Sequence, residues 1–97
     1  MTTMGEILKI FRLLQEEEIT TTKLSQLTGY SQPHISRIEN NTKKPTDEFL
    51  EKISEVYNVP IKEFYRILHI ANEKGYDRPR LCLEVVKTYL KYNKEGD

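Results

Sequence analysis

Residues 20–39 read TTTKLSQLTGYSQPHISRIE, and this stretch decides the fold. It predicts two short helices joined by a tight turn. Thr20 and Ser31 carry hydroxyl groups that can cap the two helix N-termini, where the first backbone N–H groups have no helical acceptor. Gly29 suits the left-handed conformation that commonly ends a helix. Pro33 falls in the first turn of the second helix, where its missing N–H costs nothing.

The apolar residues of this stretch give each helix one inward face. Leu24 and Leu27 form this face on the first helix, and Ile35 and Ile38 form it on the second. The opposite face of the second helix is left with Gln32, Pro33, Ser36 and Arg37. A unit of this shape presents the start of its second helix outward, and that end fits the major groove of DNA.

These residues resemble the helix-turn-helix of the Cro/cI-type (XRE-like) repressor family. The resemblance covers roughly Gly5 to Phe64. The matching positions, all in one register, are Thr20–Thr21, Leu24–Ser25, Gly29, Ser31–Gln32, Ile35–Asn40 and Lys44–Pro45. The resemblance implies an all-α, five-helix Cro/cI-repressor-like DNA-binding domain, to which this chain adds a C-terminal helix.

The resemblance also implies one buried ion pair, and the expected arginine is missing from its position in this sequence. In many members an arginine near the end of the first helix pairs with the glutamate that matches Glu39. Leu14 occupies the arginine's place here, and Arg12 is out of step with it. Glu39 is therefore expected to cap or to bond locally.

The remaining chain shows helical periodicity and no strand pattern, so the predicted fold class is all-α. The expected helices are Gly5–Glu17, Thr21–Thr28, Gln32–Asn40, Asp47–Tyr57, Ile61–Glu73 and Arg78–Tyr92. The first has a broad apolar surface, which predicts contact with more than the helix-turn-helix, including the C-terminal segment. Met1 to Met4 is expected to be a loose end or a short arm.

Two units are expected within this fold. Residues 1–74 form the helix-turn-helix DNA-binding domain, and residues 75–97 form a C-terminal helix. The apolar residues of that helix that are candidates for dimerisation are Leu83, Val86, Tyr89 and Leu90. They either complete the core of one chain or meet a second copy, and both roles can hold at once.

The charge balance is neutral, with 15 basic and 15 acidic residues, whereas nucleic-acid binders often have a basic excess. Distribution matters more than the sum, because a local patch can engage phosphates while acids face away. Within residues 30–46, Arg37, Lys43 and Lys44 stand against Glu39 alone. DNA binding is therefore compatible with the composition, but strong non-specific affinity is not expected.

Several function classes lack support in the sequence. No apolar run is long enough for a membrane span, and the N-terminus lacks the features of a signal peptide, so a cytoplasmic protein is expected. Cys82 cannot form an internal disulfide and is expected to be buried. One cysteine with His34 and His69 does not make a usual zinc site, and no phosphate-cradling glycine loop exists. No enzyme activity, metal or cofactor is expected.

The candidate DNA contacts fall into two groups. Base contacts are expected from Gln32, Pro33, Ser36 and Arg37, since glutamine can bond adenine and arginine guanine at two points. Phosphate contacts are expected from Thr20, Thr21, Ser31, His34, Asn40, Lys43 and Lys44. Purely structural roles stay open for these residues, as a helix cap for Thr20 and as solvated surface for the lysines and the base-facing side chains.

Two hypotheses compete. The first is a sequence-specific double-stranded DNA-binding transcriptional regulator, a repressor that acts as a homodimer on two half-sites. The second is a protein-interaction module, an antitoxin or immunity-type component, that binds a partner protein through the first and sixth helices. The register of residues 20–45 favours the first hypothesis, and the neutral charge and broad apolar faces favour the second.

Overall fold

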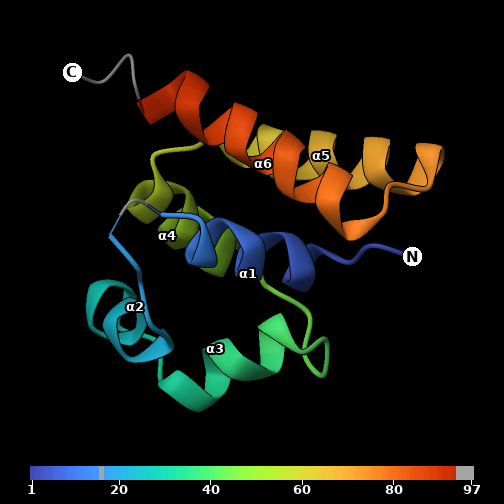
Figure 1. Cartoon of the computed structure of the whole chain (residues 1–97). Helices are drawn as coiled ribbons and strands as arrows, with labels where there is room; N and C mark the ends of the chain where they lie inside the picture. Colours follow the sequence, from blue (N-terminus) through green and yellow to red (C-terminus); the bar gives the residue numbers. More distant parts are fainter. Residues whose placement is uncertain (16, 94–97) are drawn as a thin grey trace.

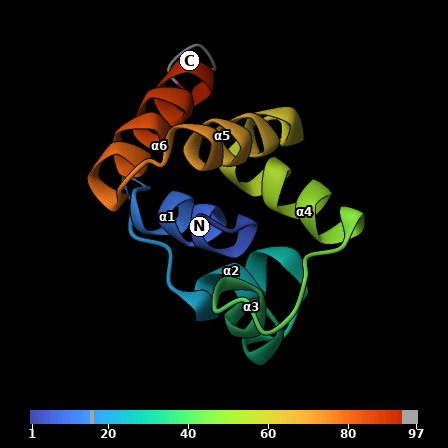
Figure 2. The same ribbon diagram turned by 90° about the vertical axis from the view of Figure 1, so that its right-hand side faces the viewer.

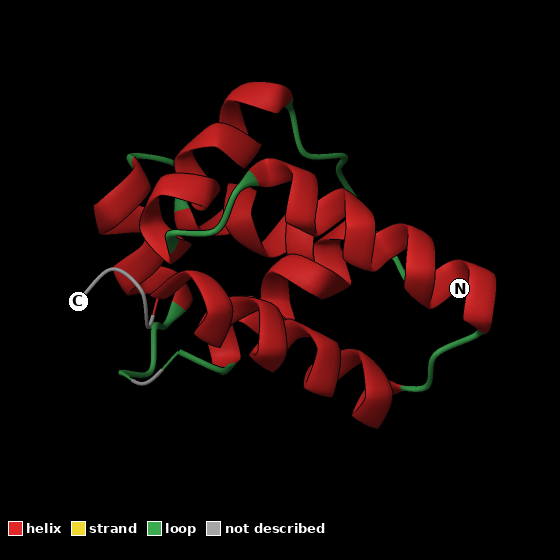
Figure 3. Cartoon of the chain, turned by 90° about the horizontal axis from the view of Figure 1, so that it is seen from above, coloured by secondary structure: helices red, strands yellow, loops and turns green. Residues whose placement is uncertain are grey.

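A computed structural model describes residues 1–15 and 17–93, and these form α-helices without any strand. The helices are α1 (Met4–Leu13), α2 (Thr21–Thr28), α3 (Gln32–Glu39), α4 (Asp47–Tyr57), α5 (Ile61–Lys74) and α6 (Arg78–Asn93). Figure 3 shows them joined by loops. The all-α prediction is confirmed. The predicted bounds match for α2 and α4 and differ by one residue at the C-terminal ends of α3, α5 and α6.

Helix α1 lies at the centre of the molecule (Figure 1). It packs against α3 on one side and against α5 and α6 on the other, whereas α2 contacts α3 and α4. Helices α3 and α6 lie at opposite ends of the molecule in the two perpendicular views of Figures 1 and 2. The first helix therefore contacts more than the helix-turn-helix, as its broad apolar surface predicted.

The core is built around the aromatic ring of Phe11 on α1. The ring centroid of Tyr57 lies 6.0 Å away in a stacked arrangement, and that of Phe64 lies 5.2 Å away, edge to face. Leu81 and Val85 of α6 are also fully buried in this cluster. Helix α6 thus completes the core of a single chain. Cys82, which lies next to Leu81 in sequence, was expected to be buried but is only partly buried.

Helix α1 is shorter than predicted. It ends at Leu13, and the N–H of Leu14 makes the last bond of the helix to the carbonyl of Ile10 at 3.0 Å. Leu13 and Leu14 are 41% and 39% exposed. Leu27 of α2 is 50% exposed, so its predicted inward position was wrong. The chain must leave α1 there to reach α2, which lies at the periphery (Figure 1) and buries only Leu24.

The N-terminal residues are tied down rather than loose. The N–H of Thr2 donates to Oδ1 of Asn72 at 2.8 Å, and Nδ2 of Asn72 donates to the carbonyl of Thr2 at 3.0 Å. Thr2 is 9% exposed, and Thr3 caps α1 by accepting from the N–H of Glu6. The expectation of a loose end or arm over Met1 to Met4 was therefore wrong for all but Met1.

No helix within the described ranges has the length and apolar character needed to cross a bilayer.

The hydroxyl of Tyr57 is the buried side-chain polar atom that lacks a hydrogen-bond partner among the described residues. Burial raises the pKa of this phenol well above its usual range, and Glu39 nearby raises it further. Since an unpaired buried hydroxyl is destabilising, we expect Tyr57→Phe to leave the free energy of unfolding unchanged or to increase it by up to about 1 kcal/mol. Urea denaturation measures this, and a clear loss of stability would indicate that the hydroxyl has a bonding partner.

Candidate nucleic-acid interface

Helices α2 and α3 are capped as the sequence predicted. The hydroxyl of Thr20 accepts from the N–H of Lys23 at 3.0 Å, and that of Ser31 accepts from the N–H of His34 at 3.3 Å. Gly29 ends α2 in the left-handed region, with a φ of 82°. These features fix the angle at which α3 leaves the turn.

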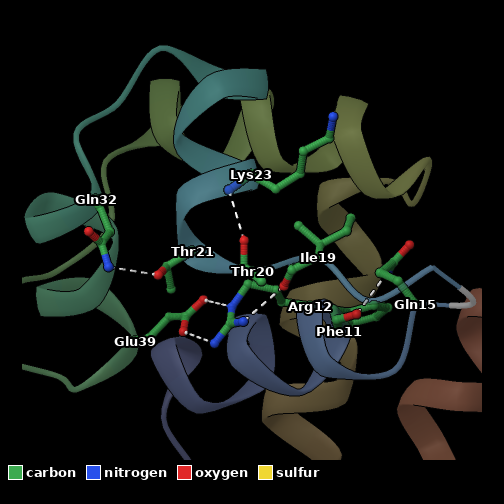
Figure 4. A network of polar contacts seen from close by, with 9 residues as sticks. All are labelled: Phe11, Arg12, Gln15, Ile19, Thr20, Thr21, Lys23, Gln32 and Glu39. Carbon is green, nitrogen blue, oxygen red and sulfur yellow. Dashed lines mark hydrogen bonds and ion pairs between the residues drawn. The ribbon is translucent and has the colours of Figure 1, made fainter.

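Helix α3 is held against the body of the protein by apolar and ionic contacts. Ile35 and Ile38 are 0% and 1% exposed, which confirms their predicted inward position. Beside them Glu39 is only 7% exposed. Its carboxylate accepts from Nε of Arg12 at 2.8 Å and from Nη2 of Arg12 at 2.9 Å (Figure 4).

The Arg12–Glu39 pair corrects the expectation that Glu39 bonds locally. Arg12 lies four residues after the buried Leu8, on the same face of α1, and this spacing was the available signal. The hydrogen bond to Glu39 raises the pKa of the Arg12 guanidinium, although burial opposes the shift. Nη1 of Arg12 also donates to the carbonyl of Ile19 at 2.9 Å, so one side chain joins α1, α3 and the segment that enters α2.

The first turn of α1 also lies directly against the end of α3. A Cβ atom added at Gly5 would overlap the backbone carbonyl oxygen of Ile38 and would lie 2.7 Å from Oδ1 of Asn41. Sequence reasoning missed this contact, and a glycine in the first turn of a helix was its only signal. Gly5 thus allows the close approach of α1 and α3 on which the position of α3 depends.

The four predicted base-contact residues lie on two lines along α3. Pro33 and Arg37, four residues apart, are exposed at the centre of the outward face. Gln32 and Ser36 lie on the flank toward α2, where Gln32 is exposed and Ser36 is half-buried. Nε2 of Gln32 donates to the hydroxyl of Thr21 at 3.0 Å, and this bond holds the amide at the start of α2 (Figure 4).

The predicted phosphate-contact residues surround this face. Thr21 is half-buried and bonded to Gln32, while the hydroxyls of Thr20 and Ser31 are engaged as caps. Asn40 is the exposed C-cap of α3, and the exposed residues Lys43 and Lys44 follow in the loop to α4. The structure therefore gathers the candidates of both groups around one end of the molecule, with the exposed side of α3 at its centre.

His34 lies in an aromatic cluster on the flank of α3 opposite Gln32. Its ring stacks on Tyr30, with centroids 5.1 Å apart and planes 12° apart, and Phe49 lies 5.8 Å away. Nδ1 of His34 is 3.3 Å from Nζ of Lys43, which can only donate. Burial lowers the pKa of His34, and Lys43 and Arg37 lower it further. The neutral ring therefore accepts from Lys43 and adds no positive charge.

The exposed charges near α3 favour DNA binding more than the net charge of zero indicates. Glu39, the one carboxylate within residues 30–46, is turned inward and neutralised by Arg12. The exposed charges of that stretch are therefore Arg37, Lys43 and Lys44, all positive. Such a patch attracts phosphates even on a protein without net charge.

Two capped helices at a left-handed glycine turn, with the second exposed at its N-terminal end, define a helix-turn-helix protein. A family model described as helix-turn-helix matches residues 8–64, which is more than half of the chain. The chain belongs to this Cro/cI-type (XRE) helix-turn-helix family. Members of this family are DNA-binding regulators, and the family is not a catalytic one. The match includes most of α1 and part of α5 and leaves out α6. No curated protein and no solved structure matched the chain.

Proposed function

We propose that this protein is a sequence-specific double-stranded DNA-binding repressor that acts as a homodimer, in the cytoplasm, with α3 in the major groove. The observation that carries the proposal is the exposed side of α3, which bears Arg37, is followed by the exposed Lys43 and Lys44, and is supported from behind by α1. Occupying an operator would exclude polymerase by steric hindrance, and neither a ligand nor covalent chemistry is required.

Direct readout of bases is assigned to the exposed side of α3. Arg37 can bond guanine at two points from the centre of this side, and Gln32 can bond adenine from the flank next to Thr21. The ring of Pro33 would contact a thymine methyl, and the hydroxyl of Ser36 a base edge. Each good two-point contact discriminates against the wrong base by about 1–3 kcal/mol.

The surrounding residues are assigned to the DNA backbone. Thr20, Thr21 and Ser31 place hydroxyl and N–H groups at two helix N-termini, which favour phosphate. Lys43, Lys44 and Asn40 would contact the backbone beyond α3. His34 would donate from Nε2 as a neutral ring, since its Nδ1 is occupied by Lys43.

The size of the recognition unit supports the proposal of a homodimer. One recognition helix contacts few base pairs, and dimers of this class bind half-sites about 34 Å apart. The protomer measures 36 × 34 × 22 Å, so two copies side by side along a duplex would place their α3 helices at about that spacing. Leu83, Val86, Tyr89 and Leu90 remain the predicted dimerisation residues, and sedimentation of the Leu83→Ala/Leu90→Ala variant tests this prediction.

The proposal is tested by selecting bound sequences from random duplex DNA and by measuring two variants on the selected site. We expect an enriched palindrome. Arg37→Ala should weaken binding to this site by about 1–3 kcal/mol and to random DNA far less, because it removes a base contact. Lys44→Ala should weaken both and reduce the salt slope by about 1, because it removes a phosphate contact.

The exposed Lys74 on α5 provides the matched control, since Lys74→Ala removes the same charge outside the proposed interface. It should leave both affinities unchanged. Equal losses on selected and random DNA for Arg37→Ala would contradict the base-reading role of that residue, and the absence of an enriched sequence would contradict specificity altogether.

A further inference from the structure

Helix α6 offers an apolar ridge on the side opposite to the core. Its buried residues Leu81, Val85 and Thr88 face the body of the protein. Leu83 and Leu90, seven residues apart, are 55% and 49% exposed, and half a helical turn separates them from the buried face. The half-buried Val86 lies between them. We call Leu83, Val86 and Leu90 the α6 ridge, and their spacing is that of a helix–helix seam.

The charges beside the ridge have one sign. Arg80, Lys87 and Lys91 are exposed, and none has an ion-pair partner within residues 1–15 and 17–93. Glu84 is the only carboxylate between Arg78 and Asn93, and Nη1 of Arg66 binds it at 2.8 Å. An occupant of the ridge must therefore bring its own negative charge to satisfy this basic rim.

A second copy of the chain fits these requirements less well than a separate acidic partner when two copies bind one operator. The ridge lies opposite the buried face of α6. Helix α3 lies at the other end of the molecule in both Figure 1 and Figure 2. Two ridges meeting about a two-fold axis would direct the two α3 helices to opposite sides rather than toward one duplex. They would also bring two basic rims together without a free carboxylate on either α6.

We propose that the α6 ridge is a docking surface for another protein, which presents an amphipathic helix with an apolar stripe flanked by Asp and Glu. Such a helix would pack its stripe on the ridge and pair its carboxylates with Arg80, Lys87 and Lys91. A membrane surface fits less well, because the ridge has no aromatic side chain and little apolar area to insert. Since α3 stays open, the chain would bind DNA and this partner at the same time.

The test uses a labelled synthetic peptide of about five helical turns, with leucines along one face and glutamates beside them. The control peptide has lysines in place of the glutamates. Fluorescence anisotropy with the full chain should show the glutamate peptide binding at least about tenfold more tightly than the lysine peptide. Leu83→Ala/Leu90→Ala should weaken it by about tenfold or more, and Lys87→Glu should reduce the preference for the glutamate peptide.

Leu27→Ala is the matched control, because Leu27 is equally exposed but lies on α2. It should leave peptide binding unchanged. Saturating glutamate peptide should change the affinity for the selected DNA site by less than about twofold. This readout on peptide binding is separate from that of the proposed function, so either can fail while the other stands.

Five outcomes would overturn the proposal. The two peptides could bind equally, or binding could survive the double leucine variant. A wild-type dimer that becomes monomeric in Leu83→Ala/Leu90→Ala, seen by sedimentation, would identify a second copy as the occupant. Binding to phosphatidylglycerol vesicles that is lost in the same variant would identify a membrane. Release of DNA by the glutamate peptide would contradict simultaneous binding.

Discussion

Replacing Gly5 with alanine is expected to destabilise the fold by about 3 kcal/mol, at the upper end of overpacking effects. The added methyl group would overlap the backbone carbonyl oxygen of Ile38, and a backbone atom cannot move aside as a flexible side chain can. Helices α1 and α3 would have to separate, which loosens the support behind the recognition surface. Urea denaturation gives the free energy of unfolding, and affinity for the selected DNA site should fall with it.

Gly75→Ala separates this steric effect from the general cost of replacing a glycine. Gly75 has a φ of 64°, but nothing lies within 4 Å of an added Cβ atom. The left-handed backbone alone should cost about 1–2 kcal/mol there. If Gly5→Ala were no more destabilising than Gly75→Ala, the close approach of α1 to α3 would be disproved.

The second large effect is expected from Glu39→Ala, which should reduce the free energy of unfolding by about 3–5 kcal/mol. The variant leaves the guanidinium of Arg12, which is 8% exposed, in the protein interior without its carboxylate. Arg12→Ala should cost a similar amount, since it strands Glu39 and also removes the donor to Ile19. Urea denaturation of both variants measures these losses.

A double substitution shows whether the stability depends on the ion pair itself or on the volume that the two side chains fill. Arg12→Met/Glu39→Leu replaces two charges by apolar groups, so it should recover most of the stability that either alanine variant loses. The exposed pair of His69 and Glu73 is the control, and Glu73→Ala should cost less than about 0.5 kcal/mol. Losses below about 1 kcal/mol for Glu39→Ala would show that the ion pair does not support α3.

The sequence predicted the helices well where local signals agree. Helix α2 has Thr20 before it and Gly29 after it, and α4 begins after the cap Thr46, so both sets of bounds were recovered. Local signals failed at the end of α1, where Leu13 and Leu14 continue an apolar run. The bond from Arg12 to Ile19 ties the following segment toward α2, and this tertiary contact has no local signature.

Core positions on α5 show a related limit. Tyr65 and Ile67 are two positions apart and both are large hydrophobic residues, yet Tyr65 is 49% exposed and Ile67 is 0% exposed. When a helix has apolar residues on two adjacent stripes, its sequence alone does not tell which stripe faces the core. The choice is made by α1 and α6, which cover the stripe of Phe64, Ile67 and Ala71.

The candidate site was predicted as a set of exposed residues but not as an arrangement. The outward position of Arg37 follows from its spacing to the buried Ile35 and Ile38. By contrast, the bond from Gln32 to Thr21 joins residues 11 apart, and the pair of Arg12 and Glu39 joins residues 27 apart. Such contacts depend on how helices pack, which periodicity within one helix does not encode.

The bonds between Thr2 and Asn72 have a consequence for the order in which a nascent chain acquires its structure. They join residues 70 positions apart, so they cannot form until α5 has left the ribosome. The same holds for the burial of α1 against α5 and α6. Helix α1 is therefore synthesised before α5 and α6, and its apolar faces stay uncovered until those two helices follow. A ribosome that stalls before residue 78 would have synthesised the complete helix-turn-helix but not α6, which packs against α1.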